Sequence, residues 1–133
     1  MNAKTASIIF GIVFILVGIL GFIPNGIINP HDAIFHADAL HSTVHLVSGV
    51  LFLIVGFATP GSAAIFCKIF GVVYFLLGVL GFINFGTDGM GELLGFLHVN
   101  GADNYLHVGL GILIFAGGML NAAPETMQTP KKR

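Results

Sequence analysis

Long apolar runs occupy most of this 133-residue chain, and they constrain its fold more than any other feature. The chain is 56% hydrophobic and only 8% charged, with a mean hydropathy of +0.97, whereas soluble proteins carry roughly 25% charged residues. A run of about 20 apolar residues crosses a bilayer as a helix. The sequence therefore predicts an all-α integral membrane protein, a bundle of four transmembrane helices.

Proline and glycine mark the expected helix ends. We expect helices near residues 5–23, 41–59, 63–83 and 104–121, since "PNG" follows the first run and "PG" separates the second from the third. The four-helix domain is expected to cover residues 1–123. Residues 124–133 are expected to form a disordered basic tail on the cytoplasmic side.

Two helical hairpins repeat along the chain. The stretch "FGIVFILVGILGFIPN" at 10–25 matches "FGVVYFLLGVLGFINF" at 70–85 at nine of sixteen positions. With a slightly longer offset, "HLVSGVLFLIVG" at 45–56 matches "HVGLGILIFAGG" at 107–118 at four of twelve positions. We interpret residues 5–59 and 63–121 as duplicated hairpins with the same orientation in the membrane.

The basic residues are segregated from the histidines. All of them lie near the chain ends or just after residue 60, at Lys4, Lys68, Lys131, Lys132 and Arg133. The positive-inside rule then places both termini in the cytoplasm and the histidine-bearing loops, residues 24–41 and 84–104, outside a bacterial plasma membrane. The single cysteine, Cys67, is expected to be a buried structural thiol.

Glycines and one histidine share a helix face. Because an α-helix has about 3.6 residues per turn, His45 falls on the same side of its helix as Gly49 and Gly56. Glycines spaced two turns apart form a flat stripe against which another helix packs closely. His45 should therefore point into the bundle, about one turn below its outer end, and His107 repeats the arrangement. An ionisable residue at that depth is by default a functional hypothesis.

A transition-metal site is one interpretation of these histidines. His41 and His45 are spaced i, i+4, which places both imidazoles on one helix face. His107 should join them, together with His36 or His98 from the loops. Imidazole suits zinc, copper or iron, so we consider zinc or copper first.

Three other interpretations of the histidines stay open. They could form a polar rim bonded to water and headgroups, with Asp38, Ser42, Asp103 and Asn104 as helix-start residues. They could hold a haem between His45 and His107. They could also act as a pH-responsive switch or proton pathway.

The order of these motifs resembles one protein family. "GILGFIP", a polar loop, "HLVSG", then "GVLGF" and "NYLHVGLG" are similar to a family of small four-helix bacterial membrane proteins catalogued as a domain of unknown function. The resemblance covers nearly the whole chain. It implies four spans and marks His45, Asn104 and His107 as family-like positions, and it implies no activity.

Three classes of function therefore remain for an integral membrane protein of unknown molecular role. The first is a module that binds a metal or haem at its outer face, and the second is an accessory or scaffold subunit without a cofactor. The third is a small transporter. The absence of an acid or base in the middle of any expected span argues against this third class. We expect binding rather than catalysis. The expected partners are the lipid bilayer and a homo-oligomer or larger membrane complex, without nucleic acid.

Overall fold

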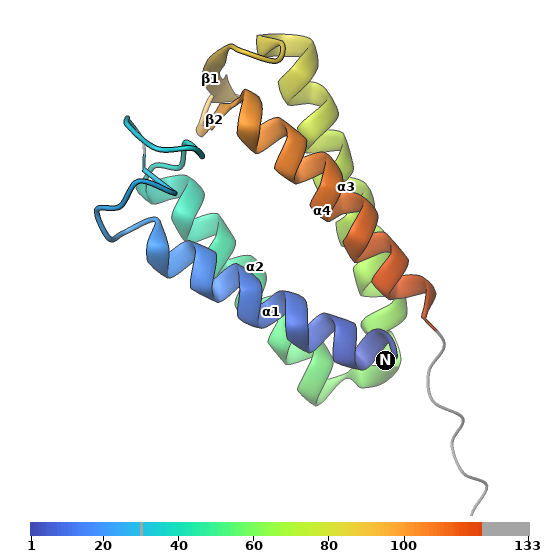
Figure 1. The fold of residues 1–133 in the computed structure, drawn as a ribbon. Helices are drawn as coiled ribbons and strands as arrows, with labels where there is room; N and C mark the ends of the chain where they lie inside the picture. The colour runs from blue at the N-terminus through green and yellow to red at the C-terminus, as the bar shows by residue number, and fades with distance from the viewer. Residues whose placement is uncertain (30, 121–133) are drawn as a thin grey trace, which may run out of the picture.

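The computed structural model describes residues 1–29 and 31–120 and is mostly helical in this part of the chain (Figure 1). The elements are α1 (Ala3–Leu20), α2 (Ala39–Ala58), the short 3-10 helix η1 (Pro60–Ser62), α3 (Ala63–Phe85), β1 (Met90–Leu93), β2 (Leu97–Asn100) and α4 (Gly101–Met119). The four long helices begin and end close to the positions expected from the sequence, with small differences at each end. The expected tail, residues 124–133, lies outside the described residues.

The long helices pack as two hairpins. α1 lies along α2, and α3 lies along α4, while contacts between the two pairs are fewer (Figure 1). The N-terminus, η1 and the end of α4 lie together at one end of the molecule (Figure 1). The α1–α2 connection and the two strands lie at the opposite end, so both polar connections are on the same side.

Three helices are long and apolar enough to cross a membrane. They are α1, α2 and the continuous helical segment Pro60–Phe85 that contains η1 and α3. α4 is not among them, because its first two turns carry Asp103, Asn104 and His107. The described residues thus contain three candidate spans, one fewer than the sequence predicted.

A two-stranded antiparallel sheet interrupts the helical fold. β1 pairs with β2 in a register that places Met90 opposite Asn100 at one end and Leu93 opposite Leu97 at the other. The turn between them uses left-handed backbone at Leu94 (φ 56°) and Gly95 (φ 81°), which is favourable for glycine. From the sequence, this segment was expected to be a loop. Its two strands have only four residues each, too few for alternation of apolar residues to distinguish them from a loop.

Close backbone approach at glycines holds each hairpin together. A Cβ atom added to Gly49 would lie 2.8 Å from the carbonyl oxygen of Gly11 on α1. In the other hairpin, a Cβ atom on Gly111 would lie 2.8 Å from the carbonyl oxygen of Gly71 on α3. The glycine stripes therefore face the neighbouring helix, as expected from the sequence. They permit tight van der Waals packing, which matters in lipid because the hydrophobic effect does not drive helices together there.

An aromatic cluster fills the space between the hairpins. The Phe14 ring stacks on Phe52 with centroids 5.5 Å apart and meets the Tyr74 ring edge-on at 5.0 Å. Cys67 is fully buried in the same cluster, which confirms the expectation of a buried thiol. This packing lies directly below the histidines, since Phe14 also contacts the His45 ring.

Candidate metal centre

Capping residues set where the histidine-bearing helices begin. Asp38 caps α2, and its Oδ1 accepts a hydrogen bond of 2.8 Å from the backbone N–H of His41. Asn100 caps α4 in the same way, accepting from the N–H of Asp103 at 3.0 Å in a reciprocal capping box. The expectation that Asp38 and Asp103 are helix-start residues is therefore correct. These caps place His41, His45 and His107 within the first two turns of α2 and α4.

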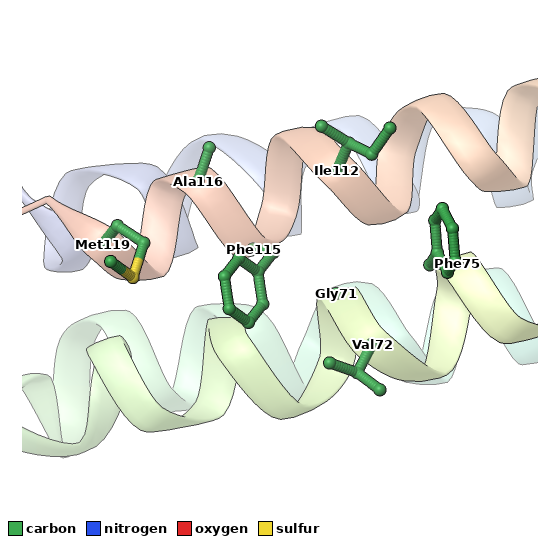
Figure 2. Close-up of a pocket in the computed structure, with 7 residues that line it drawn as sticks. All are labelled: Gly71, Val72, Phe75, Ile112, Phe115, Ala116 and Met119. Carbon is green, nitrogen blue, oxygen red and sulfur yellow. The ribbon is translucent and has the colours of Figure 1, made fainter.

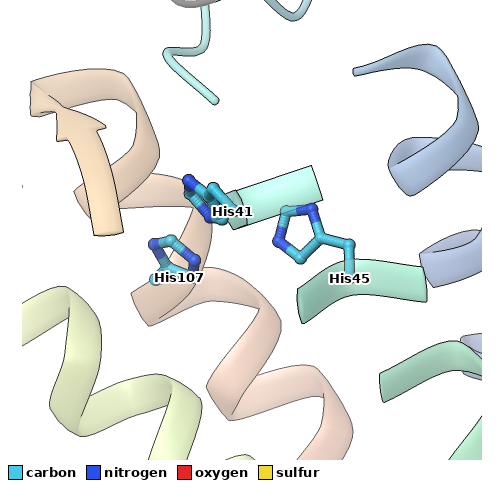
Figure 3. A group of neighbouring side chains, drawn as sticks. All are labelled: His41, His45 and His107. Atoms are coloured by element: carbon cyan, nitrogen blue, oxygen red, sulfur yellow. The ribbon is translucent and has the colours of Figure 1, made fainter. Parts of the chain in front are cut away.

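His41, His45 and His107 come together in a buried group (Figure 3). A ligand nitrogen from each residue lies within 4.8 Å of those of the other two. The ring centroids of His41 lie 4.7 Å from His45 and 5.6 Å from His107. The three side chains are only 2%, 7% and 6% exposed. Bonds from zinc to imidazole are about 2.0–2.1 Å long, so the three nitrogens are near enough to share one ion if the side chains move closer together.

The His41 ring is oriented by a backbone carbonyl. Its Nδ1 lies 2.7 Å from the carbonyl oxygen of His98 on β2. Because a carbonyl can only accept, Nδ1 carries the hydrogen and donates it, which leaves the lone pair on Nε2 free. A carbonyl that fixes the tautomer and orientation in this way is the usual outer partner of a metal-binding histidine.

The other two members of the group have nitrogens without a partner. Nδ1 of His45 and Nδ1 of His107 are buried and make no hydrogen bond within the described part of the chain. Buried polar atoms in native proteins nearly always have a partner, and an unpartnered one is costly. Two such nitrogens beside a third imidazole indicate a place that favours a ligand.

Two further polar side chains without partners lie close to the histidines in sequence. Ser42 and Asn104 are fully buried, and their side-chain polar atoms make no hydrogen bond to any described residue. Each packs against a glycine: a Cβ atom on Gly21 would overlap Ser42 Oγ, and one on Gly81 would overlap Asn104 Oδ1. Ser42 and Asn104 were expected to be helix-start residues, but neither caps its helix.

His36 and His98 form a separate pair beside this group. Their rings stack with centroids 5.9 Å apart and an interplanar angle of 11°. Burial lowers the pKa of His36 from its ordinary value, and the nearby His98 lowers it further. The structure thus gathers three of the five predicted site residues and places the other two in a neighbouring pair. His98 still contributes to the group through its carbonyl oxygen, whereas His31 is exposed in the α1–α2 connection.

Reciprocal hydrogen bonds join the two hairpins above the histidines. The His41 side chain of the first hairpin donates to the His98 carbonyl of the second. Conversely, Asp103 Oδ2 of the second hairpin accepts from the backbone N–H of His36 in the first, at 2.9 Å. This second role of Asp103 was not predicted from the sequence. The sequence repeat could have indicated this role, because the offset that pairs His36 with His98 also pairs His41 with Asp103.

An apolar pocket on the second hairpin is separate from these polar groups. It has a volume of about 490 Å³ and lies on the outer face of α3 and α4 (Figure 2). Its lining consists of Gly71, Val72, Phe75, Ile112, Phe115, Ala116 and Met119. None of these side chains carries a charge or a titratable group, so this pocket is apolar throughout.

Comparison with known proteins identifies one family. The model of the family described as domain of unknown function DUF4383 matches residues 4–120. No curated protein and no solved structure matches the chain.

Proposed function

The chain belongs to the DUF4383 family of unknown function, and we propose that it is a four-span membrane protein that binds one transition-metal ion through His41, His45 and His107. The observation that carries this proposal is the buried group of three imidazoles, whose ligand nitrogens lie within 4.8 Å of one another. Neutral imidazoles suit zinc and copper. The carbonyl-oriented His41 supports a built site rather than a chance cluster.

Two properties of α4 support its assignment as the fourth span. Its 19 residues extend about 28 Å at 1.5 Å per residue, close to the thickness of a hydrocarbon core. Its polar residues Asp103, Asn104 and His107 are buried, while Leu113 and Met119 are 60% exposed. A helix that keeps its polar side chains inside and presents apolar ones outside is suited to lipid.

The repeated contacts support an internal duplication. The Gly11–Gly49 approach in the first hairpin has its counterpart in the Gly71–Gly111 approach in the second. When the repeated sequence stretches are aligned, Gly11 falls on Gly71 and Gly49 falls on Gly111. His45 falls on His107 in the same alignment. The ion would thus lie where the two halves of the duplication meet.

The placement of Lys4 and Lys68 supports an outward-facing site. Lys4 lies in the first turn of α1, and Lys68 lies in the second turn of α3, shortly after η1. The N-terminus and η1 lie together at one end of the molecule, and the two strands lie at the other (Figure 1), so the positive-inside rule assigns the end with the N-terminus to the cytoplasm. In a Cys67→Ala background, a membrane-impermeant thiol reagent added outside should label Asn29→Cys and spare Thr59→Cys. Labelling of Thr59→Cys alone would reverse the assignment.

The space around the histidines favours a single ion over a haem. A cavity of about 100 Å³ adjoins His45 and His107, whereas sites for drug-sized ligands measure about 300–1,000 Å³. His41 also lies against both of the other rings, so a porphyrin between His45 and His107 would have to displace it. A pure polar rim would leave the buried Nδ1 atoms of His45 and His107 unexplained.

The test is the metal content of the full chain purified in detergent from cells supplied with zinc or copper. We expect about one ion per wild-type chain and none in a His45→Gln/His107→Gln double variant, since Gln keeps a polar side chain of similar size without an imidazole lone pair. His31→Ala is the matched control, and it should retain the metal because His31 is exposed and outside the group. Far-UV circular dichroism verifies folding of each variant. If wild type and double variant are both metal-free and equally stable, the histidines are a polar rim.

A further inference from the structure

We propose that the bound ion keeps one coordination position open toward an adjoining cavity and takes a small exogenous ligand there: water, hydroxide or a small anion. This inference rests on the metal site proposed above and assigns it a binding activity. The observations that carry it are the number of protein donors and the cavity beside two of them.

The three histidines supply one ligand fewer than a closed tetrahedral metal site requires. The group contains three imidazoles, and among the described residues it includes no thiolate and no carboxylate. Structural zinc sites are usually closed by four protein ligands, whereas three protein ligands with an open fourth position are typical of sites that bind and activate a ligand. Cys67, the single thiol, lies in the aromatic cluster instead.

A cavity lies next to the histidines. It measures about 100 Å³ and is lined by His45, His107 and Asp103 on its polar side. The remaining lining side chains are apolar and come from α1 and α4: Val13, Phe14, Val17, Leu106 and Leu110. A water molecule takes about 30 Å³ in the liquid, so the cavity accommodates about three waters or one small anion.

A second cavity extends toward the α1–α2 connection. It measures about 240 Å³, and it shares Val17, His45, Asp103 and Leu106 with the first. Its other lining residues, among them Ile28 and Phe35, belong to or lie near that connection. The two cavities together offer a route for a small ligand from the loop-bearing end of the molecule.

The charge of the site selects the ligand class. Three neutral imidazoles leave the full charge of a divalent ion uncompensated, which favours a hydroxide or a small anion in the open position. Such an ion lowers the pKa of a bound water to about 7. The Asp103 carboxylate lines the same cavity, where it would accept a hydrogen bond from a bound water and would disfavour a multiply charged anion more than a singly charged one.

Cobalt(II) and azide provide the test in the detergent-purified full chain, because cobalt replaces zinc and its visible absorption reports on its ligands. Titration with azide should change the spectrum of the cobalt-loaded wild type saturably while cobalt stays bound. In Val17→Phe, which adds bulk at a position that lines both cavities, cobalt should bind normally and the affinity for azide should fall at least tenfold. Leu16→Phe adds similar bulk at the neighbouring, 56% exposed position and should behave as wild type.

The outcomes separate the two proposals. If cobalt binds through the histidines but azide leaves the wild-type spectrum unchanged, the metal site stands and the open position is wrong. The open position is also wrong if Val17→Phe responds to azide as wild type does, or if azide strips the cobalt from the protein. If no cobalt binds, the metal site itself fails, and the inference fails with it.

Discussion

Two glycines on α4, close together in the sequence, allow a sharp test of the packing between helices. Gly111 faces α3, where a Cβ atom would overlap the backbone N of Phe75 and lie 2.8 Å from the carbonyl oxygen of Gly71. Gly109 faces outward, and a Cβ atom there would meet nothing within 4 Å. Alanine at Gly111 should therefore destabilise the α3–α4 hairpin, and alanine at Gly109 should not.

The magnitude follows from the geometry. Ordinary van der Waals contact begins at 3.4 Å, so α4 must retreat by roughly half an ångström or more to accept a Cβ atom 2.8 Å from the Gly71 oxygen. A gap of about 0.5–1 Å removes roughly a quarter to a half of the dispersion energy of the atoms it separates, and overpacked positions typically cost about 1–3 kcal/mol. Alanine is preferred over glycine in a helix by roughly 0.5–1 kcal/mol. That gain applies to both variants, so Gly111→Ala should be about 1–3 kcal/mol less stable than Gly109→Ala.

The assay is unfolding of each purified variant in mixed micelles, with helicity followed by far-UV circular dichroism as the denaturing detergent increases. Gly49→Ala, whose Cβ atom would lie 2.8 Å from the Gly11 oxygen, should behave like Gly111→Ala and extends the test to the first hairpin. Equal unfolding midpoints for Gly111→Ala and Gly109→Ala would refute the argument that glycine permits the close approach.

Three further predictions concern the core, the reciprocal hydrogen bonds and the metal. Phe52 is fully buried and packs on four other phenylalanine rings. Phe52→Ala should therefore lower the unfolding free energy by about 3–5 kcal/mol, and a loss below about 1 kcal/mol would contradict the described core. Asp103→Leu removes the acceptor of the N–H groups of His36 and Asn100, and each donor left unsatisfied should lower the unfolding free energy by about 1–3 kcal/mol. Hydrogen exchange at both amides should accelerate, and unchanged rates would show that these bonds are not formed. Metal content should fall as the pH of equilibration is lowered, because protons compete with the ion for the imidazole lone pairs; binding that is independent of pH would exclude histidine ligation.

Features that depend on local spacing were predictable from the sequence. Counting back one span from Pro60 predicts that His45 lies about one turn inside its helix; α2 begins slightly earlier, at Ala39, so His45 lies nearly two turns inside. The face that it shares with Gly49 turns it toward the interior, where the structure has it. The i, i+4 spacing correctly brought His41 beside His45. The repeat, which pairs His45 with His107, added His107 to the same group. Helical periodicity and repetition are visible in the order of residues alone, so they can be read without a structure.

Features that depend on irregular backbone were not predictable. His36 or His98 was expected to join the other histidines; in the structure the carbonyl oxygen of His98 accepts from His41, and the ring of His98 stacks on His36. Every residue carries a carbonyl, so no sequence pattern marks the one that orients a histidine. The β1–β2 hairpin that aims this carbonyl consists of strands too short for a periodic signal.

The reciprocal bonds between the hairpins have an evolutionary consequence. Under the proposed duplication, the ancestor was a pair of identical hairpins, and each copy carried the same residue at the position now occupied by His41 or Asp103. In a symmetric pair the same side chain faced both loops, so a residue that only accepts, such as aspartate, could not be combined with a donor at the equivalent position. Once both hairpins belonged to a single chain, the two positions could diverge: His41 donates to one loop and belongs to the histidine group, and Asp103 accepts from the other and lines the cavity beside that group. The two halves of the bundle thereby carry different chemistry at equivalent positions.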